Sequence, residues 1–276
     1  MDLDLTHAKP RQIYNLLIGL VAPRPIAWIT SVNLAGQLNA APFSAYNYMG
    51  IDPPIVAVGV GNRPGPGLVG KDTAHNIRET GEFVINVVNE AVAEAMNITA
   101  IDFPPEVNEL DITNLVTEPS MIVKVPRIAA APASLECREI TTIEIGRTRI
   151  ILGQVVAIHV KDEFIDLAGP YIRAEELHAV GRMNGLGAYV KTRNAFFSIP
   201  RMAYEDWKKQ HGEKPQRPES FNGEEHQRRR LAKVAALEND PSKDKPAVAE
   251  PPLSPPPHEQ TESEAVEMWE NEGDPN

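Results

Sequence analysis

A lysine and a threonine flank the start of a predicted helix. Lys71 comes just before segment 73–80, which has the composition of a short helix and is followed by Gly81. Asp72 or Thr73 would cap this helix, and the N–H groups of its first turn would then point outward, toward a bound anion. Lys71 and Thr73 are therefore a candidate phosphate site. An ordinary capped helix at the surface is an equally compatible interpretation.

A long polar stretch without charged residues lies between Pro25 and Ile51. Within it, Thr30-Ser31 ends one predicted strand, and residues 39–44 (NAAPFS) begin the next. Small residues allow a planar ligand to approach the backbone, and Asn and Ser side chains hydrogen-bond the carbonyl and imide edge of a heterocycle. A hairpin rich in turns, without a ligand, is the other interpretation.

Two nucleotide-binding motifs are almost present, and both fail. Residues 59–64 (GVGNRP) begin like the dinucleotide fingerprint, but Pro64 replaces the third glycine and no helix follows at once. Residues 65–71 (GPGLVGK) match most of a P-loop, but Asp72 stands where Ser or Thr would hold magnesium. Because a carboxylate at this place repels phosphate, we exclude an NTPase.

Side chains for acid–base, nucleophilic or metal chemistry are sparse. Glu136 and Glu139 share a predicted strand without a persuasive acid–base role, and Cys137 between them is expected in the core. The histidines lack metal-ligand spacing, and His159 is expected to be a hydrogen-bonded strand residue. No G-x-S-x-G motif is present. We therefore assign no catalytic side chain and no metal site.

The composition excludes several classes of protein. The 276 residues include 27 basic and 38 acidic ones, for a net charge of −11, so the basic face that meets nucleic-acid phosphates is not expected. A single cysteine excludes an internal disulfide framework. The acidic N-terminus lacks the features of a signal peptide, and the uncharged stretch is too polar to span a membrane. We predict a cytoplasmic protein without a membrane or nucleic-acid partner.

Strands outnumber helices before residue 205. A helix is expected at 9–20, with Pro10 in its first turn, and another, capped by Asn89, through Met96. The expected strands are 25–32, 37–46, 55–60, 82–88, 134–145 and 148–160, the last two forming a hairpin. The helices do not alternate regularly with the strands. This favours a closed antiparallel barrel with peripheral helices over a doubly wound α/β fold.

The composition changes near Tyr204, which separates a barrel domain, 1–204, from a tail, 205–276. The tail holds 17 acidic and 10 basic residues and several prolines in clusters. Such a segment buries too little apolar area to offset its ordering entropy, so we predict a mostly disordered Pro/Glu-rich tail. The exception is 224–237 (EEHQRRRLAKVAAL), which favours a helix. Its thin apolar stripe indicates a solvated or edge-packed helix rather than one that binds a membrane or a partner.

Several short motifs follow one another between residues 10 and 200. They are 24–31 (RPIAWITS), 39–47 (NAAPFSAYN), 52–54 (DPP), 71–77 (KDTAHNI), 81–86 (GEFVIN), 135–137 (LEC) and 180–182 (VGR). Each is weak alone, but the ordered set resembles the flavin reductase-like family, with its FMN-binding split barrel, and within it the flavoredoxin-like branch. The tail has no counterpart in this resemblance.

The resemblance implies a mainly β fold, a six-stranded antiparallel Greek-key split barrel with peripheral short helices. It also implies a homodimer with FMN near the subunit interface. The residues that would line the isoalloxazine and ribityl chain are Thr30, Ser31, Asn39, Ala41 and Ser44. Those that would hold the phosphate are Lys71 and Thr73, with further contacts from Trp28 and Arg24. In 178–183 (HAVGRM), Ala179 stands where the family often has proline, which leaves the nicotinamide contacts open.

The resemblance further implies an oxidoreductase in which hydride passes from C4 of NADH or NADPH to N5 of the flavin. An NAD(P)H:flavin oxidoreductase is the leading hypothesis. One alternative is an FMN-carrying electron-transfer protein that exchanges electrons with a protein partner, and another is a barrel that serves only as a binding scaffold. The sequence leaves open the choice of nicotinamide, and whether FMN is a prosthetic group or a substrate.

Overall fold

The computed structural model describes residues 2–62, 70–101, 103, 109–166, 168–169, 171–185, 187–193, 196–199, 201–211 and 228. The chain divides into one unit of residues 1–196 and 262–276 and another of 197–261. The described part of the second unit includes helix α6 (Tyr204–His211), which the sequence analysis did not predict. The expected helix at 224–237 lies outside the described residues apart from Arg228, and the domain boundary at 204 stays a prediction.

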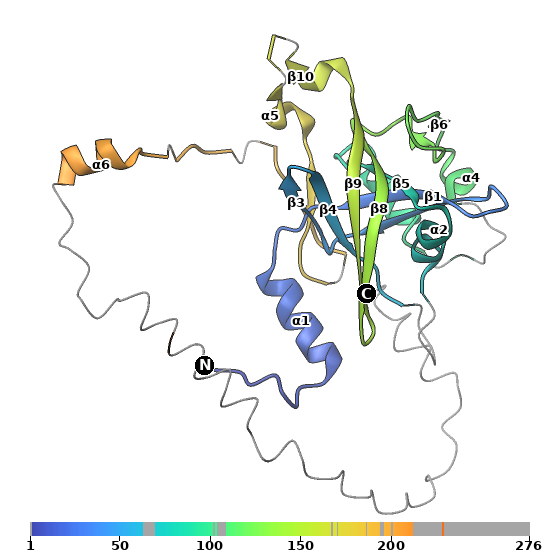
Figure 1. The fold of residues 1–276 in the computed structure, drawn as a ribbon, viewed down its shortest axis with the longest axis horizontal. Coiled ribbons are helices and arrows are strands. Elements are labelled where there is room, and N and C mark those ends of the chain that lie inside the picture. The colour runs from blue at the N-terminus through green and yellow to red at the C-terminus, as the bar shows by residue number, and fades with distance from the viewer. Residues whose placement is uncertain are drawn as a thin grey trace, which may run out of the picture. The chain divides into compact units, whose positions relative to one another are not determined.

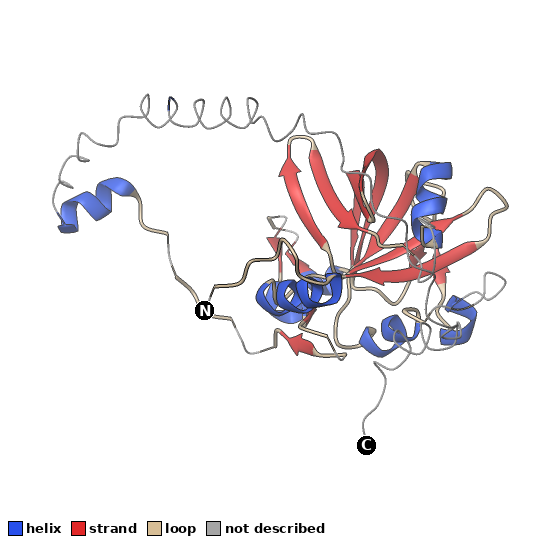
Figure 2. Cartoon of the chain, turned by 90° about the horizontal axis from the view of Figure 1, so that it is seen from below, coloured by secondary structure: helices blue, strands red, loops and turns tan. Residues whose placement is uncertain are grey.

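The first unit is built on a seven-stranded antiparallel sheet (Figures 1 and 2). In sheet order its strands are β2 (Leu38–Phe43), β1 (Ala27–Val32), β5 (Glu82–Asn86), β8 (Ala133–Ile145), β9 (Thr148–Val160), β4 (Pro54–Gly59) and β3 (Tyr46–Ile51). The expected hairpin of two long strands is confirmed as β8 and β9, which pair from Ala133↔Val160 to Ile145↔Thr148.

The sheet must curl, because its two edge strands are consecutive in the chain. Only Ser44 and Ala45 separate β2 from β3, so three peptide steps, roughly 11 Å at most, join opposite edges of the sheet. The Gly59 N–H donates to the Ala45 carbonyl at 2.6 Å, which ties β4 to this connection. Figure 2 shows the resulting curvature of the strands. The expected split-barrel fold is thereby confirmed.

Two details differ from the expectation. The segment 37–46, expected as one strand, divides at Ser44-Ala45, because Tyr46 pairs with Val58 of β4 instead of continuing β2. The main sheet therefore has seven strands instead of the expected six. Asn89 does not cap the following helix: α3 begins at Ala93, and residue 89 instead forms a bridge with Ala179.

Short helices and two-stranded ladders complete the unit. The remaining helical elements are α1 (Pro10–Leu20), α2 (Asp72–Thr80), α3 (Ala93–Ile98), α4 (Glu109–Thr113), η1 (Asp162–Phe164) and α5 (Ala174–Leu177). The ladders pair β6 (Thr117–Glu118) with β7 (Arg127–Ile128), β10 (Ile165–Asp166) with β11 (Tyr171–Ile172), and β12 (Val180–Arg182) with β13 (Tyr189–Lys191). Among the described residues, no helix has the length and apolar character needed to cross a membrane.

Alternation along β1 places its side chains in two of the three hydrophobic clusters of the described residues. Ile29 of β1 belongs to the cluster inside the curled sheet, with Phe83 and Cys137, whereas Trp28 belongs to a cluster that includes Met96 of α3. Neighbouring residues of a strand point to opposite faces, so β1 is covered on both sides. Burial raises the pKa of the Cys137 thiol well above its ordinary value, and the nearby Glu136 charge adds to this, which confirms the expected core role of Cys137.

Candidate functional site

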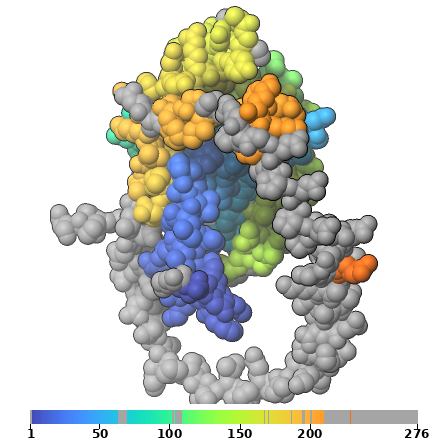
Figure 3. Space-filling view, turned by 90° about the vertical axis from the view of Figure 1, so that its left-hand side faces the viewer, coloured from blue at the N-terminus to red at the C-terminus, as the bar shows by residue number. Residues whose placement is uncertain are grey.

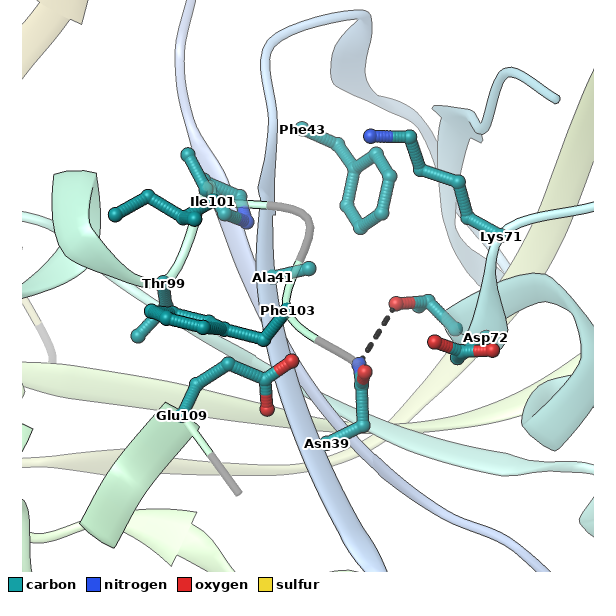
Figure 4. Close-up of a pocket in the computed structure, with 12 residues that line it drawn as sticks. Asn39, Ala41, Phe43, Lys71, Asp72, Thr99, Ile101, Phe103 and Glu109 are labelled. Atoms are coloured by element: carbon teal, nitrogen blue, oxygen red, sulfur yellow. Dashed lines mark hydrogen bonds between the residues drawn. The ribbon is translucent and has the colours of Figure 1, made fainter. Parts of the chain in front are cut away.

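A pocket of about 150 Å³ lies between β2, the start of α2 and the segment from α3 to α4 (Figure 4). From β2 it receives the side chains of Asn39, Ala41 and Phe43. The start of α2 adds Lys71, Asp72 and Thr73, and the segment after α3 adds Thr99, Ile101 and Glu109 among others. The structure thus brings together four residues expected at a ligand site, namely Asn39, Ala41, Lys71 and Thr73.

Strand alternation explains why β2 presents these side chains. Asn39, Ala41 and Phe43 are two residues apart and therefore share one face of β2. The Asn39 amide donates to the Thr73 hydroxyl at 3.0 Å, a bond drawn in Figure 4. Thr73 is only 1% exposed, so this bond fixes the start of α2 against the strand. The pocket is consequently held between two firmly joined elements.

The N-terminus of α2 gives the pocket an anion-binding character. The first backbone donor within the helix is Ala74, which bonds the Lys71 carbonyl at 2.9 Å, so the Thr73 N–H is not used by the helix. The side chain of the N-cap residue Lys71 makes no capping hydrogen bond to this end of the helix. Such an end combines N–H donors with the positive end of the helix dipole, and both favour an oxyanion.

The carboxylates of Glu109 and Asp72 also line the pocket, and their negative charge disfavours an anion. Glu109 lies in the pocket wall, and its Oε2 accepts the Ala40 N–H at 3.3 Å. Burial raises the pKa of the Glu109 carboxyl above its ordinary value, and the charge of Asp72 adds to the rise, although two backbone hydrogen bonds act against it. The sequence analysis missed Glu109, because no motif or spacing connects it with Lys71. The charge of the pocket therefore depends on the protonation of Glu109.

We expect Glu109→Gln to strengthen binding of inorganic phosphate at pH 8 about threefold to tenfold, because it removes a like-charge repulsion of about 1 kcal/mol. The raised pKa means that the wild type loses this charge at a higher pH than an ordinary glutamate does, so the difference in affinity between wild type and variant should shrink as pH falls. Phosphate titrations at several pH values measure both effects. Glu94→Gln, at an exposed position of α3, is the control. Weaker binding by Glu109→Gln would contradict this role.

Three other expected site residues have buried side chains that are satisfied within the protein. Trp28 donates its Nε1–H to the Thr99 hydroxyl at 2.9 Å, and the Thr30 hydroxyl donates to the Pro126 carbonyl at 2.7 Å. The Ser31 hydroxyl accepts a bond from the Asn76 amide at 3.1 Å. All three side chains are fully buried and support the strand beside the pocket, and their contact with a ligand stays a prediction.

Arg24 and Ser44 lie together, apart from this pocket. The Arg24 guanidinium, in a residue 9% exposed, donates to the backbone carbonyls of Ile18 (2.6 Å), Val21 (2.9 Å) and Met183 (2.5 Å). Its Nε–H is 3.4 Å from the Ser44 hydroxyl. Most N–H groups of Arg24 thus form hydrogen bonds within the protein. Through these bonds Arg24 links α1, the end of β2 and the segment after β12.

Glu136 is a buried charged residue, and its surroundings give it a structural role. Its fully buried carboxylate accepts the backbone N–H groups of Met121 (2.6 Å), Ile122 (2.7 Å) and Val123 (2.9 Å) and lies 2.5 Å from His159 Nε2. Burial by itself raises the pKa of this carboxyl, but the bonds from His159 and the three N–H groups outweigh burial and lower it to about 2. The expected role of His159 as a hydrogen-bonded strand residue is confirmed.

Comparison with known proteins gives the class that this fold and pocket define. The family model of the flavin reductase like domain matches residues 20–173, and the chain belongs to this family. A protein of Deinococcus radiodurans is 41% identical over 212 residues, which are 75% of this chain and 92% of that protein. The expected family is therefore confirmed.

Solved structures agree with this assignment. Nitrilotriacetate monooxygenase component B from Bacillus cereus is 31% identical, with a TM-score of 0.67 over 72% of this chain and 98% of that one. The 2-nitrobenzoate 2-nitroreductase of Pseudomonas fluorescens is 34% identical, with a TM-score of 0.66 over 74% and 98%. The flavoredoxin of Desulfovibrio vulgaris, 18% identical over 75% of this chain and 100% of its own, shares the fold with a TM-score of 0.57. The chain is thus similar to a monooxygenase component and a nitroreductase, and it shares the fold of a flavoredoxin.

Proposed function

We propose that this chain is a cytoplasmic FMN-binding oxidoreductase, specifically an NAD(P)H-dependent flavin reductase. The observation that carries the proposal is the pocket in which Asn39, Lys71 and Thr73 meet at the N-terminus of α2. A cation, a hydroxyl and a helix N-terminus together suit a phosphate monoester. Membership of the flavin reductase-like family supplies the class of cofactor that carries such a phosphate.

Different residues of the pocket would contact different parts of FMN. Lys71 and the N-terminus of α2 would hold the phosphate, while Asn39 and Ala41 of β2 would border the ribityl chain. When bound, FMN would supply the acceptor atom N5 for hydride from C4 of the nicotinamide. The chain itself would orient the ligand through the fixed Asn39–Thr73 pair, and no side-chain acid or base is assigned to the reaction.

We expect Lys71→Ala to weaken FMN binding by about 1.5–3 kcal/mol, the range for a charge-assisted hydrogen bond. A flavin titration followed by fluorescence measures the dissociation constant. Lys124→Ala is the matched control, since Lys124 is exposed in the loop before β7 and does not line the pocket. An unchanged dissociation constant for Lys71→Ala would remove Lys71 from the phosphate site.

We expect anaerobic mixing of the FMN-loaded protein with NADH or NADPH to bleach the visible flavin absorbance. Bleaching by at least one of the two nucleotides supports the reductase. If neither bleaches the flavin but a chemical reductant does, the chain is an electron-transfer protein reduced by a partner. Failure to take up FMN leaves the scaffold alternative. Reoxidation by 2-nitrobenzoate would extend to this chain the activity named for its relative from Pseudomonas fluorescens.

We also propose that the protein is a homodimer. Helix α1 has no buried residue, and its apolar side chains Tyr14, Leu17 and Leu20 are at least half exposed. The helix lies on the surface of its unit (Figure 3). On β3, Tyr48 and Met49 are exposed as well. A second copy is the proposed cover for these apolar groups, because symmetric dimers are the commonest assemblies. Light scattering that gives a monomer mass at micromolar concentration would contradict this.

A further inference from the structure

The two ends of the connection from β4 to α2 lie against Arg149, near the start of β9. Asn62 and Gly70, at these two ends, pair as an antiparallel bridge. Arg149 donates from Nη1 to the side-chain oxygen of Asn62 at 3.1 Å, and its backbone carbonyl accepts the Val60 N–H at 2.9 Å. The side chain of Arg149 is only 11% exposed. One enclosed arginine is thus joined to the segment that precedes the α2 pocket.

Gly70 packs directly against the guanidinium of Arg149. A Cβ atom at residue 70 would lie 2.8 Å from Nη1 of Arg149, which is too close for a van der Waals contact. The backbone φ of Gly70 is not positive, so the close approach, and not the backbone conformation, requires glycine here. The position of Gly70 therefore depends on the position of the guanidinium.

An ion-pair network holds the guanidinium from another side. Arg149 donates from Nε to Glu144 Oε1 at 3.1 Å, and Nη2 of Arg78 donates to the same oxygen at 2.5 Å. Arg78 belongs to the last turn of α2. Both Glu144 and Arg78 are exposed, so their ion pair by itself contributes little to stability. Its effect is to give the Arg149 guanidinium a second charge-assisted partner besides Asn62.

Gly70 is joined by its peptide bond to Lys71, the lysine of the α2 pocket. The Lys71 carbonyl accepts the first N–H groups of the helix, so a shift of Gly70 changes the direction in which the Lys71 side chain leaves the backbone. Thr73 has a separate support, the hydrogen bond from Asn39. Arg149 is not among the residues that line the pocket. Its influence on a ligand would therefore pass through Gly70 and Lys71.

We propose that Arg149 is a positioning residue for the phosphate of FMN: it holds Gly70 in place, and through Gly70 it directs the Lys71 ammonium toward the phosphate. The inference rests on the proposed function, because FMN supplies the phosphate that Lys71 would bind. It is carried by the close contact at Gly70 and by the two hydrogen bonds that fix the guanidinium. Arg149 thereby acts on one end of the ligand, the phosphate.

Titrations of the full chain with FMN and with riboflavin, followed by flavin fluorescence, test this role. Riboflavin has the same ring system and ribityl chain but no phosphate. Arg149→Ala should weaken FMN binding about fivefold to twentyfold, because Lys71 loses part of a charge-assisted hydrogen bond, and should change riboflavin affinity less than about twofold. Arg149→Lys should also weaken FMN binding, because an ammonium keeps the charge but cannot hold both partners of the guanidinium. Arg138→Ala is the matched control, since it removes an arginine of β8 that pairs with Glu82 and does not line the pocket.

A double-mutant cycle distinguishes positioning from general destabilisation. In the Lys71→Ala background, Arg149→Ala should lower FMN affinity by less than about twofold, because the group that Arg149 positions is already absent. Gly70→Ala should weaken FMN binding in the wild type but not in Arg149→Ala, where no guanidinium meets the added methyl group.

Three results would each overturn the inference while leaving the proposed function intact. They are FMN affinity unchanged by Arg149→Ala, an equal loss with and without Lys71, and full FMN affinity in Arg149→Lys. Absence of FMN binding by the wild type is a different result, because it would overturn the proposed function and this inference with it.

Discussion

Glu136→Gln should lower the free energy of unfolding by about 3 kcal/mol at pH 7, the scale for loss of one partner in a buried charge-assisted network. Three consecutive N–H groups, from Met121 to Val123, and His159 all point at the two oxygens of this carboxylate. Glutamine is nearly isosteric, but it is neutral and turns an NH₂ group toward some of these donors. The variant therefore leaves at least one buried donor without an acceptor.

Glu136→Gln should also remove part of the pH dependence of the free energy of unfolding. The pKa of Glu136 is lowered in the folded protein from 4.5 to about 2, so the folded state retains the charge while the unfolded chain takes up a proton. The stabilisation is complete above about pH 4.5 and is lost as pH falls toward 2. The difference between wild type and Glu136→Gln should consequently shrink over this range.

Urea unfolding at pH 7, 4.5 and 3 measures this difference. Glu139→Gln is the control on the same strand, because the Glu139 carboxylate accepts a hydrogen bond from the Thr142 hydroxyl and lacks the three backbone donors that Glu136 holds. The control should change stability by less than about 0.5 kcal/mol. A Glu136→Gln protein as stable as the wild type at pH 7 would show that the loop from 121 to 123 does not depend on the charge.

Arg24→Lys should detach α1 from the barrel while the sheet stays folded. No residue of α1 is buried, so its attachment depends on contacts such as those from Arg24 to the carbonyls of Ile18 and Val21. The same guanidinium reaches Met183 and Ser44. A lysine ammonium is a compact charge with three donors and cannot satisfy acceptors in these separate directions. We expect a loss of about 2–3 kcal/mol from the broken bonds.

Hydrogen exchange distinguishes this local effect from global unfolding. The amides of α1 should exchange at least tenfold faster in Arg24→Lys, whereas those of β5 and β8 should follow only the global stability. Arg11→Lys is the matched control, because Arg11 is an exposed residue of α1 itself. Equal protection of α1 in Arg24→Lys and wild type would mean that other contacts hold the helix.

The sequence by itself determined the elements with strong local signals. The periodicity of residues 133–160 and the turn at 146–147 define the β8–β9 hairpin, and Gly81, with φ +70, ends α2 where expected. That Asn39, Ala41, Lys71 and Thr73 would share one site was expected only from the resemblance to the flavin reductase-like family. Local propensity and spacing are sufficient when a residue's role depends on its own element.

Only the tertiary structure decided which polar side chains line the pocket and which are enclosed within the fold. Thr30 is as polar as Thr73, but the Pro126 carbonyl, 96 residues away, covers its hydroxyl. Glu109 reaches the pocket from a helix that no motif connects with β2. The division of 37–46 into two strands depends instead on the β3–β4 hairpin, in which Tyr46 pairs with Val58. For Thr30 and Glu109 the deciding contact joins distant segments, and burial and hydrogen-bond pairing between such segments leave no local signal in the sequence.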